Sequence, residues 1–393
     1  MSRRVIVIIL DSLGMGALPD AADYGDVGAA TLPNLARVCK DLSLPTLQSL
    51  GIGNIVPLEG LDPVDEPLAI VGRLSTSSKG KDTITGHWEL MGVVSEQAFP
   101  LYPEGFPPEL MDAFTKLTGY GWLGNYPASG TEIIRQLGPE HMLTGNPIIY
   151  TSGDSVFQVA AHMDIIPLEE LYRICQVTRS EILVGKHACA RVIARPFIGS
   201  EEAGFTRTAD RHDYALSPPV PTALDCLHQA GIQTLCIGKI SDIFNGNGVS
   251  VSWPTKSNTE GMQMLVRALL ETAGNDKGSF IFANLVDFDM LWGHRRDSQG
   301  YAHGLEEFDQ WLATFLPKLA REDLLIITAD HGCDPTFLGT DHTREYVPLI
   351  VYSPDNNGSV DSWSSVQIHS DRGTHDLTKV ATIVEDYLLQ KNV

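Results

Sequence analysis

The 393-residue sequence lacks the features typical of disulfide-stabilised, membrane-spanning and nucleic-acid-binding proteins. Its six cysteines form no CxxC pair, which indicates reduced thiols in a chain of this size. No stretch approaches the roughly 20 apolar residues that a membrane-spanning helix needs. The net charge of −21 argues against nonspecific attraction to nucleic acid or anionic lipid. These absences predict a soluble, cytoplasmic protein with neither a nucleic-acid partner nor a membrane partner.

The first residues imitate a secretory signal, because two arginines precede an apolar run. That run covers only residues 5–10 and ends at Asp11. It is too short for the apolar region of a signal peptide. We therefore interpret this start as a buried strand.

Apolar runs at both ends of the chain predict an α/β domain. The first ten residues are apolar on both faces, as in a buried strand of a parallel sheet. Helical stretches, such as residues 259–272 and 302–319, lie between later runs of the same kind. We expect a mostly parallel sheet flanked by helices, with strands at residues 3–10, 231–240, 279–286, 323–328 and 346–352.

The length and the composition of the middle predict two domains. A chain of 393 residues exceeds one ordinary core. Prolines, glycines and aromatics are frequent from residue 99 to residue 217, and Pro-rich stretches bracket this part. We expect a core of residues 1–98 and 220–393, and a smaller inserted α+β cap of residues 99–219. The sequence carries no signal for the oligomeric state.

Aspartates and histidines follow the predicted strands. Asp11 ends the first run, VDFDMLWGHRRD follows the run at 279–286, and TADHGCDPTFLGTDHTRE overlaps the end of the run at 323–328. Ligands of an open parallel sheet gather beyond the carboxyl ends of its strands. Carboxylates and imidazoles together suit Mn²⁺, Zn²⁺ or Fe²⁺ better than Ca²⁺, and this set exceeds the needs of one catalytic ion. We predict a two-metal site of Asp11, Asp289, His294, Asp330, His331 and His342.

The alternative for each of these segments is a polar loop with a local turn role. Asp287 ranks below Asp289 as a ligand. A second polar cluster near the end of the chain follows no obvious strand. We interpret it as a solvated turn; it consists of His369, Asp371, His375 and Asp376.

The segment KGKDTITGHWELMG predicts a nucleophile at Thr83. A polar turn leads into a helix that is expected to begin near Thr83, where backbone N–H groups and the helix dipole favour negative charge. A hydroxyl needs a base or a metal to become an effective nucleophile, and the predicted metal site would supply it. The alternative is ordinary helix capping. Thr85 is the rival hydroxyl and is expected to face away.

With these motifs the chain resembles the prokaryotic phosphopentomutases of the alkaline phosphatase superfamily. The matching stretches include LDSLGMGALPDAADYGDVGAATLPNLA, GKDTITGHWELMG, VDFDMLWGHRRD and ITADHGCDPTFLGTDHTREYVPLIVY. Further matches in YTSGDSVFQVAAH and FTRTADRHDYAL extend the resemblance over nearly the whole chain, while the tail matches less well.

The resemblance implies an alkaline-phosphatase-like core with an inserted cap, two Mn²⁺ ions and a phosphothreonine at Thr83. It assigns Asp11, Asp330 and His331 with Thr83 to one ion, and Asp289, His294 and His342 to the other. Such enzymes interconvert pentose 1-phosphates and 5-phosphates through a 1,5-bisphosphate, and a sugar bisphosphate such as glucose 1,6-bisphosphate primes the cycle. These residues do not distinguish ribose from deoxyribose.

Substrate recognition is expected mainly in the cap, because arginine forks suit a phosphate that does not react. For each candidate the alternative is an ordinary surface charge, turn or structural residue. The candidates are Arg191 and Arg207 with Arg211 in reserve, Asp154 for sugar hydroxyls, Lys239 near the cleft, and His87 beside the nucleophile.

Other functions stay open at this point. A metal-dependent phosphatase or a phosphoglycerate mutase of the same superfamily is the nearest rival, and such relatives often carry serine as the nucleophile. The threonine at position 83 therefore favours the pentose enzyme. A noncatalytic metal-binding protein is the rival from another class, and the complete ligand set together with a nucleophile argues against it.

Overall fold

The chain divides into two compact units in this computed structural model, which describes residues 3–152, 155–354 and 373–389. One unit consists of Met1–Ala98 and Pro218–Val393, and the other of Phe99–Ser217. We call them the core unit and the inserted unit. The insertion begins at the residue expected from the sequence and ends two residues before the expected limit. That the inserted unit binds substrate stays a prediction.

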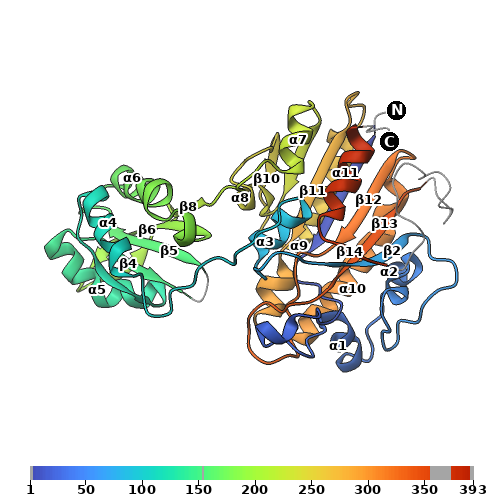
Figure 1. Ribbon diagram of the computed structural model, residues 1–393, viewed down its shortest axis with the longest axis horizontal. Helices are drawn as coiled ribbons and strands as arrows, with labels where there is room; N and C mark the ends of the chain where they lie inside the picture. Colours follow the sequence, from blue (N-terminus) through green and yellow to red (C-terminus); the bar gives the residue numbers. More distant parts are fainter. Residues whose placement is uncertain (1–2, 153–154, 355–372, 390–393) are drawn as a thin grey trace. The chain divides into compact units, whose positions relative to one another are not determined.

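The core unit contains an eight-stranded sheet of order β10-β9-β11-β1-β12-β13-β2-β14 (Figure 1). Strand β13 runs antiparallel to both of its neighbours, whereas the other paired strands run parallel. The predicted α/β class with a mostly parallel sheet is therefore confirmed. The strands are β1 (Arg4–Leu10), β2 (Ile70–Ser75), β9 (Gln233–Ile237), β10 (Val251–Trp253), β11 (Ser279–Leu285), β12 (Asp323–Thr328), β13 (Val347–Tyr352) and β14 (Thr374–Asp376).

The centre of this sheet is covered on both faces. Every residue of β1, β11 and β12 is buried, and successive side chains of a strand point to opposite faces. Helix α9 packs on β11 and β9, α7 on β9, and α11 on β1 (Figure 1). The helices are α1 (Thr31–Val38), α2 (Pro45–Leu50), α3 (Thr83–Leu90), α7 (Ala223–Gln229), α8 (Ile240–Ile243), α9 (Asn258–Glu271), α10 (Ser298–Phe315) and α11 (Lys379–Leu389).

Short turns of helix connect several of these elements. The π-helical turn η5 follows β11 and carries part of the VDFDMLWGHRRD motif. Helix α10 begins four residues before the predicted start, because the Asp297 side chain caps it by accepting a hydrogen bond from the Gly300 backbone N–H. The turns are the 3₁₀ segments η1 (Ala21–Tyr24), η2 (Ile52–Asn54) and η6 (Leu316–Lys318), and η5 (Phe288–Gly293).

The inserted unit is an α+β structure around a second sheet of order β3-β4-β5-β6-β7, with β8 also paired to β6. Its two faces carry separate apolar clusters: Ile149 belongs to one, and its neighbours Ile148 and Tyr150 belong to the other. The elements are α4 (Pro108–Thr118), β3 (Leu123–Pro127), α5 (Gly130–Thr144), β4 (Ile148–Thr151), β5 (Val156–His162), α6 (Leu168–Val177), η3 (Thr178–Ile182), η4 (Gly185–His187), β6 (Arg191–Ser200), β7 (Gly204–Arg207) and β8 (His212–Ala215).

The polar cluster near the end of the chain is in part a strand. His375 and Asp376 belong to β14, which pairs in parallel with β2. The interpretation as a solvated turn is wrong for these two residues, because the stabilising partner lies about 300 residues away and leaves no local apolar pattern. His369 and Asp371 lie outside the described residues.

Within the described part of the chain, no helix is both long enough and apolar enough to cross a membrane. The cytoplasmic location stays a prediction.

Candidate metal centre and nucleophile

The ends of three neighbouring strands bring the predicted ligands together. Strand β1 lies between β11 and β12 and is parallel to both, so their carboxyl ends meet at one edge of the sheet. Asp11 directly follows β1, Asp289 lies in η5 just past β11, and Asp330 lies two residues after β12.

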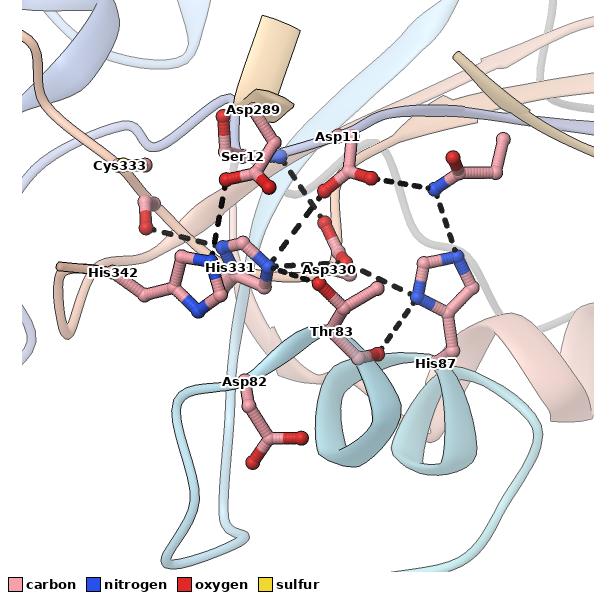
Figure 2. A network of polar contacts seen from close by, with 12 residues as sticks. Asp11, Ser12, Asp82, Thr83, His87, Asp289, Asp330, His331, Cys333 and His342 are labelled. Atoms are coloured by element: carbon pink, nitrogen blue, oxygen red, sulfur yellow. Dashed lines mark hydrogen bonds and ion pairs between the residues drawn. The ribbon is translucent and has the colours of Figure 1, made fainter. Parts of the chain in front are cut away.

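The first group consists of Asp11, Asp330 and His331, whose candidate ligand atoms all lie within 4.8 Å of one another. His331 Nε2 lies 3.7 Å from Asp11 Oδ1 and 3.3 Å from Asp330 Oδ2. The hydroxyl of Thr83 faces the same nitrogen, at 3.1 Å between Oγ1 and Nε2 (Figure 2). The structure therefore brings together all four residues that were predicted for one ion.

The second group consists of Asp289, His294 and His342. The two oxygens of Asp289 lie 3.3 Å from His294 Nε2 and 3.2 Å from His342 Nε2, and these two nitrogens lie 3.1 Å apart. The His342 ring also stacks on the His331 ring, with centroids 3.9 Å apart. The two groups are thus contiguous and form one cluster, and Figure 2 shows Asp289 and His342 beside His331.

Three buried carboxylate oxygens in this cluster, Asp11 Oδ1, Asp289 Oδ1 and Asp330 Oδ2, accept no hydrogen bond. Their polar neighbours are histidine nitrogens at 3.1 to 3.7 Å. A buried charge that accepts no hydrogen bond is costly, and a cation would satisfy these oxygens. The backbone also orients the imidazoles as ligands, since Nδ1 of His331 donates to Gly332 O and Nδ1 of His294 donates to Thr340 O. Each ring then directs Nε2 at the cluster, as is usual for metal-bound histidine. The residues fit a pair of divalent cations.

Burial, hydrogen bonds and neighbouring charges shift the pKa values in the cluster. Burial raises the pKa of Asp11 well above its ordinary value, and the charges of Asp330 and Asp289 raise it further. Burial lowers the pKa of His331 to about 4. The hydrogen bond to Asp289 raises the pKa of His294 to about 11. A cation in this cluster would relieve the repulsion and must displace the proton on His294.

Helix α3 begins at Thr83, and another residue performs the capping. Asp82 accepts hydrogen bonds from the Thr85 backbone N–H at 3.0 Å and from its hydroxyl at 2.7 Å. The Thr83 hydroxyl is left to face His331. Gly86 lets the helix approach closely, because a Cβ there would lie 2.3 Å from the Asp330 carbonyl oxygen. Helix capping therefore does not explain the position of the Thr83 hydroxyl. The Thr85 hydroxyl, in contrast, bonds the capping residue Asp82.

For His87 the structure favours the structural role that was the alternative to a phosphate contact. Its ring is fully buried, with Nδ1 donating to the Thr83 carbonyl oxygen at 2.9 Å and lying 3.1 Å from Asp330 Oδ2. Its Nε2 lies 3.2 Å from the Asn284 amide nitrogen, which also donates to Asp11 at 3.0 Å. Both ring nitrogens of His87 therefore face protein groups next to Thr83 and the carboxylates.

Two residues beside the ligands were missed by the sequence reasoning. Asn284 is a buried amide within β11, and a polar residue in the apolar run SFIFANLV is the signal that could have identified it. Ser12 adopts a positive φ of 73°, which is strained for a non-glycine residue. In this conformation its backbone N–H donates to Asp330 Oδ1 at 3.2 Å. No sequence signal indicates this strain.

The remaining predicted contacts are spread over both units. Lys239 immediately precedes α8 in the core unit, and its charge opposes the rise in the pKa of Asp11. Arg191 begins β6, and its Nη1 lies 3.6 Å from Asp213 Oδ2. Arg211 donates two hydrogen bonds of 2.6 Å to the same carboxylate. Asp154 lies outside the described residues.

An arginine cluster in the inserted unit includes Arg207, at the end of β7. Burial raises the pKa of the Tyr150 phenol, and the charges of Arg195, Arg207 and Arg211 oppose this rise. Arg195 was not among the predicted substrate contacts. Its spacing of four from Arg191 along β6 places both on one face of the strand, and this spacing was the available signal.

The chain matches known proteins over nearly its whole length. The family model described as the metalloenzyme superfamily matches residues 3–391. The phosphopentomutase of Caldanaerobacter subterraneus subsp. tengcongensis is 55% identical over 354 residues, which are 90% of this chain and 88% of the relative. The phosphopentomutase of Symbiobacterium thermophilum is 53% identical over 360 residues, which are 91% and 90% of the two chains.

A solved structure shares the fold at low sequence identity. The PH0037 protein from Pyrococcus horikoshii is 13% identical to this chain and superposes with a TM-score of 0.50. The match covers 100% of this chain and 98% of the PH0037 protein. This likeness supports the fold alone, whereas the identities above 50% over nine-tenths of the chain identify the family. The chain belongs to the phosphopentomutases, isomerases of the metalloenzyme superfamily.

Proposed function

We propose that this enzyme interconverts ribose 1-phosphate and ribose 5-phosphate, and the corresponding deoxyribose phosphates, through phosphorylated Thr83. The observation that carries the proposal is the Thr83 hydroxyl at the start of α3, 3.1 Å from His331 Nε2 in a cluster that can hold two cations. The printed names of the relatives support the same reaction and pentose phosphates as substrates.

The reaction consists of two phosphoryl transfers, one from Thr83 to the sugar and one from the sugar back to Thr83, so that the phosphorylated enzyme is restored. Phosphothreonine 83 gives its phosphoryl group to the free hydroxyl of the sugar monophosphate, whose proton leaves, and the Thr83 hydroxyl is regenerated. The resulting 1,5-bisphosphate then returns its other phosphoryl group to Thr83. A bisphosphate such as glucose 1,6-bisphosphate would phosphorylate an unmodified enzyme in the same way.

Several residues of the chain would support these transfers. Backbone N–H groups at the start of α3 favour negative charge on the nucleophile and on the phosphoryl group. His87 would hold the α3 backbone at Thr83. We assign Asp11, Asp330 and His331 to one ion and Asp289, His294 and His342 to the other. Two Mn²⁺ ions, when bound, would lower the pKa of the hydroxyl and neutralise the phosphoryl oxygens.

The first test is phosphorus NMR of the Mn²⁺-loaded protein with ribose 1-phosphate and a trace of glucose 1,6-bisphosphate. We expect the signal to move to ribose 5-phosphate with little inorganic phosphate. Accumulation of inorganic phosphate would replace the mutase proposal by a phosphatase. No change in either signal, with metal content verified, would contradict both.

Arginines of the inserted unit would bind the phosphate that does not react. Loss of a charged hydrogen bond costs about 1.5–3 kcal/mol, so Arg191→Ala and Arg207→Ala are each expected to lower kcat/KM for ribose 5-phosphate about 10- to 100-fold. The loss should be mainly in KM, measured by steady-state kinetics. We keep Arg211 in reserve, with Lys239 and Asp154 as further contacts to the sugar phosphate.

Arg135→Ala is the matched control, because Arg135 is an exposed arginine of the same unit that pairs with Glu132. It should leave both kinetic parameters unchanged. If Arg191→Ala and Arg207→Ala behave like this control, the assignment of the arginines is wrong.

A further inference from the structure

Arg344 is an arginine whose guanidinium is almost completely buried, with 2% of its side chain exposed. It lies two residues after the predicted ligand His342. Its Nε and Nη2 bond the two oxygens of Asp20, at 3.2 and 2.9 Å, and its guanidinium lies over the Tyr24 ring. Burial of such a charge requires compensation, and these contacts provide only part of it.

The remaining donors of Arg344 bond backbone carbonyl oxygens of the segment that leads to Thr83. Nη1 donates to Ser78 O at 2.6 Å and to Gly80 O at 3.2 Å, and Nη2 donates to Thr76 O at 3.3 Å. We call residues 76–80 the nucleophile loop. One side chain thus holds three of its five carbonyl oxygens.

The opposite side of the nucleophile loop is held by Glu89, a buried residue of α3. Its carboxylate accepts hydrogen bonds from the Thr76 hydroxyl at 2.6 Å, the Ser77 N–H at 2.7 Å and the Ser78 N–H at 2.9 Å. The loop therefore lies between a buried cation that binds its carbonyl groups and a buried anion that binds its donors. Hydrogen bonds to these two charged groups therefore fix the backbone path of the loop.

Asp26 links the residue that follows the nucleophile loop to the segment that carries Arg344. Its carboxylate accepts a hydrogen bond from the Arg344 backbone N–H at 2.8 Å and forms an ion pair with Lys81 at 3.0 Å. A small pocket of about 10 Å³ lies between the nucleophile loop and the cluster, and its lining includes Gly80, His331 and Arg344. It has room for about one water molecule, so the loop packs closely against the cluster.

We propose that Arg344 is a positioning residue that sets the Thr83 hydroxyl relative to the metal ligands. The proposal rests on the proposed phosphoryl transfer at Thr83. The guanidinium bonds Asp20 and the loop carbonyl oxygens, so it would act on the nucleophile through the loop backbone. Its fork geometry is required, because a lysine ammonium cannot span Asp20 and three carbonyl groups.

The test is Arg344→Lys, with Asp20→Asn as a milder second variant that keeps the guanidinium and weakens one of its anchors. For Arg344→Lys we expect kcat to fall about 10- to 100-fold, the loss typical of groups that orient a reacting or ligating residue. The rate of Thr83 phosphorylation by glucose 1,6-bisphosphate, followed by intact-protein mass spectrometry, should fall by the same factor. Asp20→Asn should give a smaller loss of the same kind.

Mn²⁺ affinity and the KM for ribose 5-phosphate should stay within about threefold of the wild type, because the ligands and the inserted unit are unchanged. A merely structural role would lower thermal stability without this split between kcat and KM. Arg73→Lys is the matched control, since Arg73 stacks on Tyr346 and bonds Thr374, and it should retain the wild-type kcat.

Two results would overturn the inference. Wild-type kcat in folded Arg344→Lys and Asp20→Asn proteins is the first. A parallel loss of Mn²⁺ affinity and kcat is the second, because Arg344 would then act on the ligands and not on Thr83. Failure of the proposed function is distinguishable, since a wild-type protein without mutase activity would fail in the NMR assay before any variant is made.

Discussion

Replacing Thr83 by alanine is expected to abolish mutase activity, with a loss on the order of 10⁴-fold or more in kcat, as found when a catalytic nucleophile is removed. The variant loses the only atom of this side chain that can accept a phosphoryl group. The fold should persist, because Asp82 caps α3 and Thr83 is only its first residue. Two measurements give the effect. An assay of the conversion of ribose 1-phosphate to ribose 5-phosphate gives kcat, and mass spectrometry of the intact protein gives the extent of phosphorylation.

Two further substitutions make this experiment specific. Thr83→Ser keeps a hydroxyl and should retain measurable activity and phosphorylation. Thr85→Ala removes the neighbouring hydroxyl, which bonds Asp82 at 2.7 Å, and should lose only a few-fold in activity through a weaker cap. If Thr83→Ala stays active while Thr85→Ala loses phosphorylation, Thr85 is the nucleophile and the assignment of Thr83 is wrong.

Removing one predicted metal ligand is expected to have the next largest effect. Asp289→Asn and Asp330→Asn each remove a negative charge from a buried cluster whose carboxylate oxygens are not all hydrogen-bonded. We expect each variant to lose tightly bound metal and at least about 100-fold in kcat, which is the upper end of the loss when only a supporting residue is removed. Metal analysis after gel filtration and titration with Mn²⁺ measure the stoichiometry.

Asp287→Asn is the control for the ligand variants. Its carboxylate accepts the Asn258 backbone N–H at 2.7 Å, and it lies two residues from Asp289 in the same motif. Metal content and activity close to those of the wild type are expected. Loss of metal in Asp287→Asn, together with full metal content in Asp289→Asn, would exchange the roles assigned to these two aspartates.

Much of the candidate site could be predicted because its residues follow strong local signals. Asp11 comes after a run that is apolar on both faces, and such a run is typical of a central parallel strand. Once three of these runs are recognised, their carboxyl ends define one edge of a sheet. The start of α3 at Thr83 was also predictable, because the polar turn KGKD precedes a helical segment.

Other features depended on contacts between distant segments. His87 lies one helical turn after Thr83, which made a phosphate contact plausible from sequence. Its actual partners are Asn284 of β11 and Asp330, which lies just after β12. Arg344 and Glu89 are of types usually found at the surface, so no pattern indicates that both are buried. The strained conformation of Ser12 is likewise the result of packing around Asp330.

The sequence by itself determined the α/β class, the type of residue at each strand end and the position of the proposed nucleophile. These follow from hydrophobic periodicity, turn chemistry and motif spacing, which are local properties of the chain. The family was indicated by the resemblance of whole motifs and shown by the sequence identity to known relatives. The tertiary structure decided the order β11-β1-β12, the reversed direction of β13 and the pairing of β14 with β2. It also decided which charges are buried, because desolvation and its compensation depend on groups that meet only when distant segments pack together.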